Sequence, residues 1–157
     1  MFFENPFDAF KNIYSSMQKN GSLNFVCWTN MMENEFFIEG MDIITKYTNE
    51  DIPEITKEPG PFAFTDKEYV IDILEFSGFK KIEVHKLYTS ISTKDSVEDN
   101  ATILVDIGPR ARILSEQNLS NEKMLIIKSE MMELSKKRKL EEEITYKACL
   151  NFVSAVK

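Results

Sequence analysis

Apolar and polar positions along the chain repeat with two different periods, and these predict helices and strands in alternation. In four segments the apolar residues recur three and four positions apart, the spacing of one face of an α-helix: 6–17, 34–47, 65–77 and 120–139. Three shorter runs are rich in β-branched and aromatic residues, as strands are: 22–28, 80–88 and 146–156. Strands alternating with helices predict an α/β protein.

Capping residues support the ends of several predicted helices. Asn5 can cap the first helix, and the proline after it suits a first helical turn. Thr65 and Glu68 form a capping box. Gly108 is followed by a proline and is expected to break residues 95–114 into two helical parts.

The remaining segments are loops or helix ends. Gly40 weakens the helix predicted at 34–47. Residues 48–64 hold three of the five prolines and are predicted to be a loop, long enough to invite a functional explanation. Ser120 opens the long helix, and its charged tail, KKRKLEEE, is expected to be a solvated helix end. In the last strand, larger residues alternate with smaller ones: Leu150, Phe152 and Val156.

Length and composition bound the class of protein. With 157 residues, 43% hydrophobic content and 12 Phe, we expect one domain over 1–157. A net charge of -7 gives phosphate binding little support, so no nucleic-acid partner is expected. The apolar runs are too short to cross a bilayer and no signal core is present, which predicts a cytoplasmic protein without a membrane partner. Cys27 and Cys149 match no metal spacing and are expected to be reduced thiols, so no metal site is predicted.

Four stretches resemble, in order, the C-terminal half of class I S-adenosylmethionine-dependent methyltransferases. The first, FFENPFDAFKNIYSSMQKNGSLNFVCW, is similar to the segment after their fourth strand, and PGPFAFTDKEYVIDILEFSGFKKIEV to the loop, helix and strand that follow; PGPFAF is typical of one bacterial subgroup of small-molecule methyltransferases. CLNFVSAVK resembles the closing strand. The matched residues of the first stretch are Asn5, Pro6, Ala9, Asn12, Met17, Gly21, Leu23, Phe25, Val26 and Trp28.

The resemblance implies a partial Rossmann-like sheet. The family's strand order 3-2-1-4-5-7-6, without its first four strands, leaves about three strands with the last one antiparallel, and we expect four to five helices. Residues 29–64 would be an inserted helix and loop forming a lid over the acceptor pocket. Residues 95–140 are a helical segment that matches the family only in placement.

The motif with which this family binds its cofactor is not found in this sequence. S-adenosylmethionine is the cofactor that the resemblance implies, and the family holds it with a glycine-rich turn. The five glycines here are too far apart to form one: 21, 40, 60, 78 and 108. We therefore expect no cofactor bound to this chain alone and an N-terminal cofactor-binding half that these residues do not include.

The resemblance also implies site residues, each with a structural alternative. Phe2 and Phe3 would form a wall beside the cofactor, and Phe62 and Phe64 would belong to the lid. The acceptor pocket would be lined by these lid residues together with two residues at the strand end, Trp28 and Asn30. Aromatic residues at strand ends are more often core than pocket, and that alternative stays open. Catalytic residues stay unknown, because methyl transfer needs mainly alignment of the reactants.

Other polar residues indicate no catalytic set. His85, the sole histidine, is more typical of a sheet-face residue than of a base. Glu33 and Glu35 suggest no acid/base dyad. Around Gly108, an acid and two arginines could bind an anion, although a solvated surface salt-bridge cluster is the stronger interpretation: Asp106, Arg110 and Arg112.

The predicted edge of the sheet leads to expectations about partners and function. The strand at 23–28 would lie at a sheet edge with unpaired peptide groups, so we expect either a homo-oligomer through this edge or a separate N-terminal half that completes the sheet. The chain would then be the C-terminal portion of a methyltransferase acting on a small molecule, inactive in isolation. Two alternatives stay open: a non-enzymatic remnant that binds a partner or a hydrophobic ligand, and a regulator whose edge captures a partner strand.

Overall fold

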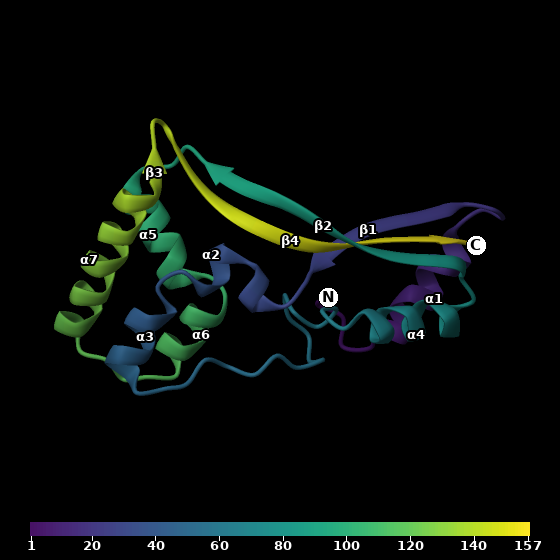
Figure 1. Cartoon of the computed structure of the whole chain (residues 1–157). Helices are drawn as coiled ribbons and strands as arrows, with labels where there is room; N and C mark the ends of the chain where they lie inside the picture. The colour runs from purple at the N-terminus through teal and green to yellow at the C-terminus, as the bar shows by residue number, and fades with distance from the viewer. The chain divides into compact units, whose positions relative to one another are not determined.

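A computed structural model describes all 157 residues and has an α/β architecture (Figure 1). The strands are β1 (Ser22–Trp28), β2 (Lys80–Thr93), β3 (Lys139–Leu140) and β4 (Glu143–Val156). The helices are α1 (Pro6–Ser16), α2 (Glu35–Ile38), α3 (Met41–Thr48), α4 (Lys67–Ser77), α5 (Val97–Asp106), α6 (Pro109–Ser115) and α7 (Asn121–Arg138), with a 3-10 turn η1 (Met31–Glu33) after β1. The predicted α/β class is confirmed.

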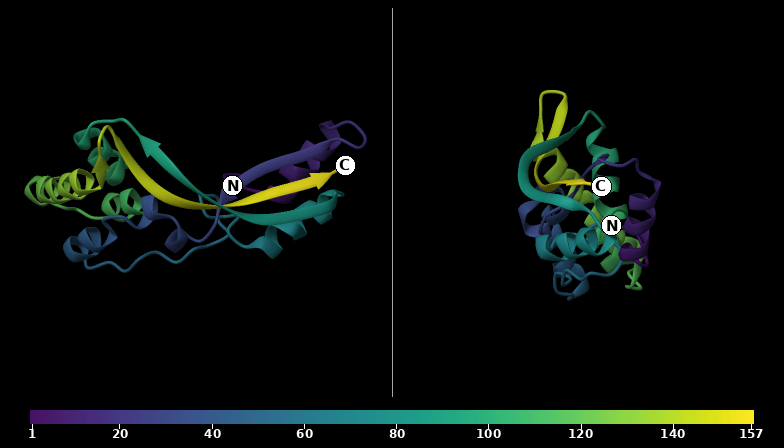
Figure 2. Two further views of the ribbon diagram at one scale, coloured as in Figure 1. Left: turned by 45° about the horizontal axis from the view of Figure 1, so that its top comes forward. Right: turned by 90° about the vertical axis from the view of Figure 1, so that its right-hand side faces the viewer.

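The sheet has the order β1-β4-β2, with the two-residue β3 paired to β4. β1 and β4 run antiparallel, with Val26 opposite Phe152 and Trp28 opposite Leu150. β2 and β4 also run in opposite directions, as their arrowheads show in Figure 2. Three long strands with an antiparallel last strand in the middle are the order 5-7-6 that the sequence resemblance implies, and β1 lies at the edge as expected.

The chain divides into two compact units, which are described separately below. Unit 1 comprises residues 1–33, 55–89 and 149–157, and unit 2 comprises residues 34–54 and 90–148. The division passes through β2 and β4, so each unit contains part of both strands.

In unit 1, α1 and α4 cover one face of the strands (Figure 1). Phe10 of α1 and Leu74 of α4 are buried together with Val153 and Ala155 of β4. Local sequence explains the helices themselves: the Asn5 side chain accepts a hydrogen bond from the Asp8 amide, as predicted. This face of the sheet therefore forms the core of the unit.

The N-cap of α4 differs from the prediction by one residue. Asp66, not Thr65, is the cap, and its carboxylate accepts the amides of Glu68 and Tyr69. A carboxylate at this position also suits the positive end of the helix dipole. Gly78 ends the helix with φ 102°, a left-handed conformation that favours glycine.

The other face of the unit 1 strands keeps large apolar side chains partly in solvent. Val26 is 49% exposed and its neighbour across the ladder, Phe152, is 39% exposed. In the unit 1 part of the last strand, Leu150, Phe152 and Val156 thus lie on this outer face, while Asn151, Val153 and Ala155 face the helices and are buried. Large side chains of the other two strands, among them Phe25 and Ile82, pack against the same helix-covered core.

Unit 2 packs its helices around a second apolar core. The fully buried residues include Ile44 of α3, Leu104 of α5, Ile127 and Met131 of α7, and Ile144 of β4. Ser120 caps α7 as predicted, its hydroxyl accepting the Lys123 amide.

Two glycine breaks in unit 2 raise the helix count above the four to five expected. Gly40 (φ 72°) separates α2 from α3, and Gly108 (φ 79°) separates α5 from α6. The break before Pro109 was predicted. The left-handed φ favours glycine at position 40, where a Cβ would also crowd the end of the Met131 side chain.

The predicted surface salt-bridge cluster is wrong for Arg110, which is buried. Its side chain is 0% exposed, and its guanidinium donates to four backbone carbonyls, those of Leu104 and of three residues at the end of α2: Phe36, Phe37 and Glu39. The side chain therefore caps helix ends inside unit 2. Arg112 does form an exposed pair, with Glu116 at 3.3 Å.

The charged tail of α7 is also less solvated than expected. Arg138 is half-buried and binds Glu35 at 2.8 Å and Glu39 at 2.6 Å. The chain then turns tightly into β3 and β4 through Glu141, which has φ 53°. Lys136 and Lys137 remain exposed, as predicted.

Candidate functional site

A small pocket opens in unit 1 just past the carboxyl end of β1. Its volume is about 380 Å³, within the range of small-molecule sites. Four chain segments contribute to it: the residues after β1, the start of α4, β2 and β4. The lining residues are Thr29, Asn30, Glu33, Thr65, Lys67, Val84, Lys86 and Asn151.

Thr29 anchors the first wall of the pocket. Its amide and its hydroxyl both donate to the Cys149 carbonyl, at 3.3 and 2.9 Å, and so extend the pairing of β1 with β4 by one residue. Asn30 then turns the chain: its side-chain oxygen accepts the Met32 amide at 2.9 Å, as asparagine does in tight turns. These contacts hold both residues at the end of the strand.

A chain of hydrogen bonds ties the floor of the pocket together. The Thr65 hydroxyl donates to the Thr29 carbonyl at 3.5 Å, and the Asn151 amide group donates to the Thr65 carbonyl at 3.3 Å. Asn151 is 4% exposed and Thr29 is 2% exposed, so these polar groups sit in a protected environment. Buried, anchored donors and acceptors can orient a polar ligand with little loss of side-chain freedom.

An ion pair lies at the rim of the pocket. Lys86 of β2 donates to the Glu33 carboxylate at 2.5 Å, and both side chains are partly exposed. The hydrogen bond from Lys86 lowers the pKa of Glu33, and the bond to Glu33 raises the pKa of Lys86. Both groups are therefore charged at neutral pH. Lys67, the first residue of α4, lines the same pocket without forming an ion pair.

Cys27 is one of the residues of β1 that face the helices, and it is not set up as a nucleophile. Burial raises the pKa of its thiol to about 11. Its sulfur donates to the Phe64 carbonyl at 3.4 Å, inside the core. Cys27 and Cys149 are both buried and are not joined in a disulfide.

The structure brings one of the predicted site residues, Asn30, into the pocket. Trp28 precedes the pocket on β1 and is half-buried, pointing away from the helix-covered face by the alternation of the strand. Phe62 and Phe64 are 9% and 3% exposed and belong to the interior of unit 1. Their lid role, like the acceptor role of Trp28 and Asn30, stays a prediction.

Phe2 and Phe3 lie before α1 and are 69% and 43% exposed. Phe3 makes an edge contact with Phe10, with ring centroids 6.1 Å apart. Their predicted place beside a cofactor stays a prediction. His85 is exposed on β2, with its Nε2 3.4 Å from Glu83, and does not line the pocket.

Sequence reasoning missed most of the pocket. Thr29 lies between Trp28 and Asn30, and Thr65 follows Phe64, all of which were predicted as site residues. Their positions could have indicated them, because residues just after a strand or just before a helix are often functional. Lys86 and Asn151 gave no such signal. They reach the pocket only because β4 lies between β1 and β2.

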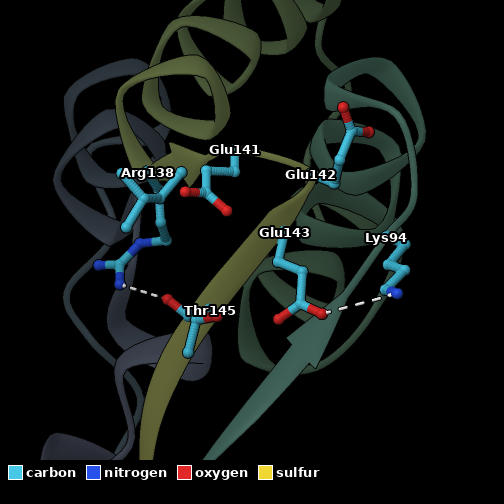
Figure 3. Close-up of a pocket in the computed structure, with 7 residues that line it drawn as sticks. Lys94, Arg138, Glu141, Glu142, Glu143 and Thr145 are labelled. Atoms are coloured by element: carbon cyan, nitrogen blue, oxygen red, sulfur yellow. Dashed lines mark hydrogen bonds and ion pairs between the residues drawn. The ribbon is translucent and has the colours of Figure 1, made fainter.

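A second depression, of about 550 Å³, lies in unit 2 where α7 turns into β4 (Figure 3). Arg138 donates to the Thr145 carbonyl at 3.0 Å, and Lys94 faces Glu143 at 3.9 Å. The other lining residues are Leu140, Glu141 and Glu142. Charged side chains with exposed partners make this a solvated surface hollow rather than an organised site.

The structure has neither a metal-binding cluster nor a helix that could span a membrane. No three or more His, Cys, Asp or Glu side chains gather closely enough to hold a metal ion. No helix combines the length and apolar character needed to cross a bilayer.

Similarity between this chain and known proteins is found among solved structures. No family model matches this chain, and no curated protein is significantly similar to it. Among solved structures, the chain is similar to a proposed methyltransferase from Bacillus halodurans C-125, with 19% identity and a TM-score of 0.43. The similarity covers 99% of this chain and 64% of that protein, so this chain spans less than two thirds of the length of the protein it resembles.

Proposed function

We propose that this chain is the acceptor-binding portion of an S-adenosylmethionine-dependent methyltransferase that acts on a small molecule. The observation that carries the proposal is the strand order β1-β4-β2 with an antiparallel β4, together with a pocket at the carboxyl end of β1. The sequence motifs imply this order, and ligands of open α/β sheets bind beyond the carboxyl ends of strands.

The pocket residues would act by positioning. Methyl transfer between two bound reactants depends chiefly on alignment and on exclusion of water. In the proposed site, Thr29, Asn30 and Asn151 orient the acceptor. Phe62 and Phe64 support the loop that precedes Thr65. No side chain in the pocket is assigned as a general base.

The residues of this chain do not form a site that fits the cofactor. The glycines with left-handed backbones all serve local packing: a Cβ on Gly40 would meet Met131, on Gly78 Tyr14, and on Gly108 Phe37. None of them lines a cradle for a nucleotide. We propose that S-adenosylmethionine is held by residues outside this sequence, and that the isolated chain is inactive.

Reading the coding sequence upstream of Met1, and then measuring binding, tests this proposal. We expect a strand, a glycine-rich turn and an acidic residue, either in the same frame or in an adjacent gene. By calorimetry, S-adenosylmethionine should bind the completed protein and bind this chain weakly or not at all. A completed protein that neither binds the cofactor nor transfers a methyl group would contradict the proposal.

We further propose that the edge strand β1 has a partner, either a second copy of this chain or the separate N-terminal half. The support is the position of β1 at the end of the strand order, which leaves one row of its peptide groups without a strand neighbour. Size-exclusion chromatography with light scattering should detect self-association of the purified chain or capture of the other half. A compact, stable monomer that binds neither would refute this.

A second candidate function is a non-enzymatic module that binds a partner or a hydrophobic ligand. It is favoured by the exposed apolar side chains on the outer face of the unit 1 strands, among them Val26 and Phe152. Contiguous apolar surface of this kind commonly marks an interaction site. Methyl transfer by a completed protein would favour the first function over this one.

A further inference from the structure

The pocket beyond β1 is lined mainly by polar and charged residues. Val84 is the one apolar residue among the eight that line it. Apolar atoms of these side chains nevertheless make up more of the exposed wall than polar atoms do, as is usual for small-molecule sites. A ligand would therefore combine apolar contact with hydrogen bonds and charge.

The side chains that line the pocket carry a net positive charge. Lys67 and Lys86 line it against one carboxylate, Glu33, so the lining carries two positive charges and one negative. This local excess occurs in a chain whose net charge is -7. Glu33 is already bound by Lys86, which leaves Lys67 as the uncompensated charge of the lining.

The position of Lys67 is unfavourable for its own helix. It is the first residue of α4, where the helix dipole favours negative charge. The adjacent carboxylate, Asp66, caps the helix and pairs with Lys57 at 3.3 Å instead. A lysine that gains nothing from helix or ion pair, at the mouth of a pocket, is placed to meet a charge on a ligand.

We infer that this pocket binds a small molecule bearing a carboxylate or a similar anionic group, and that Lys67, helped by Lys86, recognises that group. The anchored side chains Thr29, Asn30 and Asn151 hold the uncharged polar part of the ligand. The inference deepens the proposed function, on which it rests for one point only: there, the anionic molecule is the methyl acceptor.

Benzoate and benzamide are a matched pair of probes, because they share their shape and differ in charge. The complete chain, labelled with ¹⁵N, is titrated with each and followed by amide shifts in NMR. Benzoate should bind saturably, with the shifts concentrated at Asn30, Thr65 and Asn151, and benzamide should bind more weakly. Added NaCl should weaken benzoate binding, because exposed charge interactions are screened by salt.

Two variants and a control separate recognition from a general charge effect. Lys67→Gln should weaken benzoate binding by about two- to fivefold, the scale of a partly exposed ion pair, and leave benzamide unchanged. Lys86→Gln should weaken it similarly. Lys80→Gln, which removes an exposed lysine of β2 outside the pocket, should have no effect.

Three results would overturn the inference: no saturable benzoate binding, equal binding of benzamide, or unchanged binding in Lys67→Gln. None of these measurements uses S-adenosylmethionine. Failure here would therefore leave the methyltransferase proposal standing, and failure of methyl transfer by the completed protein would leave the anion site standing.

Discussion

Replacing Arg110 by methionine tests how unit 2 is held together. The side chain is 0% exposed and donates to four backbone carbonyls, at 2.8 to 3.1 Å for the three from α2. Burial lowers its pKa to about 10, so it is still charged at neutral pH. Methionine keeps the unbranched apolar stem but has no donor and no group in place of the guanidinium, so Arg110→Met removes the hydrogen bonds and leaves the buried guanidinium position unfilled.

The expected loss is about 2–4 kcal/mol. Each buried acceptor left without a partner costs roughly 1–3 kcal/mol. The sum is reduced because methionine does not bear the desolvation cost of a buried guanidinium, and one terminal nitrogen, Nη2, has no hydrogen-bond partner even in the native protein. Against a domain stability of about 5–15 kcal/mol, such a loss is large.

Urea denaturation followed by two probes measures the loss. The single tryptophan, Trp28, reports unit 1 by fluorescence, and the helices of unit 2 dominate far-UV circular dichroism. We expect Arg110→Met to lower the midpoint of the dichroism transition. The matched control is Arg112→Met in the same helix, which removes an exposed pair with Glu116 and should cost at most about 0.5 kcal/mol. Equal midpoints for the two variants would refute the reasoning.

Three further predictions concern single residues. Glu33 has a pKa below 4.5 because Lys86 binds it. Its contribution to stability is therefore present above pH 4.5 and is lost as the pH falls through the lowered pKa. Carboxyl NMR of Lys86→Met should show the pKa of Glu33 move up, and an unchanged pKa would contradict the ion pair. Gly108→Ala should destabilise by about 1–3 kcal/mol because φ is 79° there, whereas Gly60→Ala, where the new Cβ would make only an ordinary contact with the Glu58 carbonyl, should be neutral or slightly stabilising in thermal melts. Cys27 should react with iodoacetamide at pH 8.5 only as fast as the protein unfolds; rapid modification of the folded chain would disprove its burial.

Local signals in the sequence predicted the elements well, because they act over a few residues. The cap at Asn5 and the break at Gly108 each depend on backbone geometry within one turn. The cap of α4 shows the limit of such reasoning. Thr65 and Asp66 are both good caps by type, and the structure selects Asp66.

The faces of the last strand could not be chosen from its composition. Leu150 and Phe152 are the larger residues, yet Asn151 and Val153 are the buried ones. Alternation along a strand fixes which residues share a face, but it does not say which face is covered. In unit 1 the helices α1 and α4 cover the face that carries Val153 and Ala155.

Arg110 shows the same limit for charge. Its sequence surroundings, near Asp106 and Arg112, are those of a solvated helix end. In the folded chain the carbonyls of Phe36, Phe37 and Glu39 lie within hydrogen-bond distance of its guanidinium and turn it into a buried cap. Sequence spacing carries no information on carbonyls contributed by a segment about 70 residues away.

By itself, the sequence determined the α/β class, most helix limits and the order in which the strands follow one another, because periodicity, caps and glycines act locally. Only the tertiary structure decided which residues form the pocket. Thr29 and Asn151 are distant in the chain and meet because β4 pairs with β1, and Lys86 joins them from β2. Strand pairing depends on the packing of the whole sheet, which no local pattern contains.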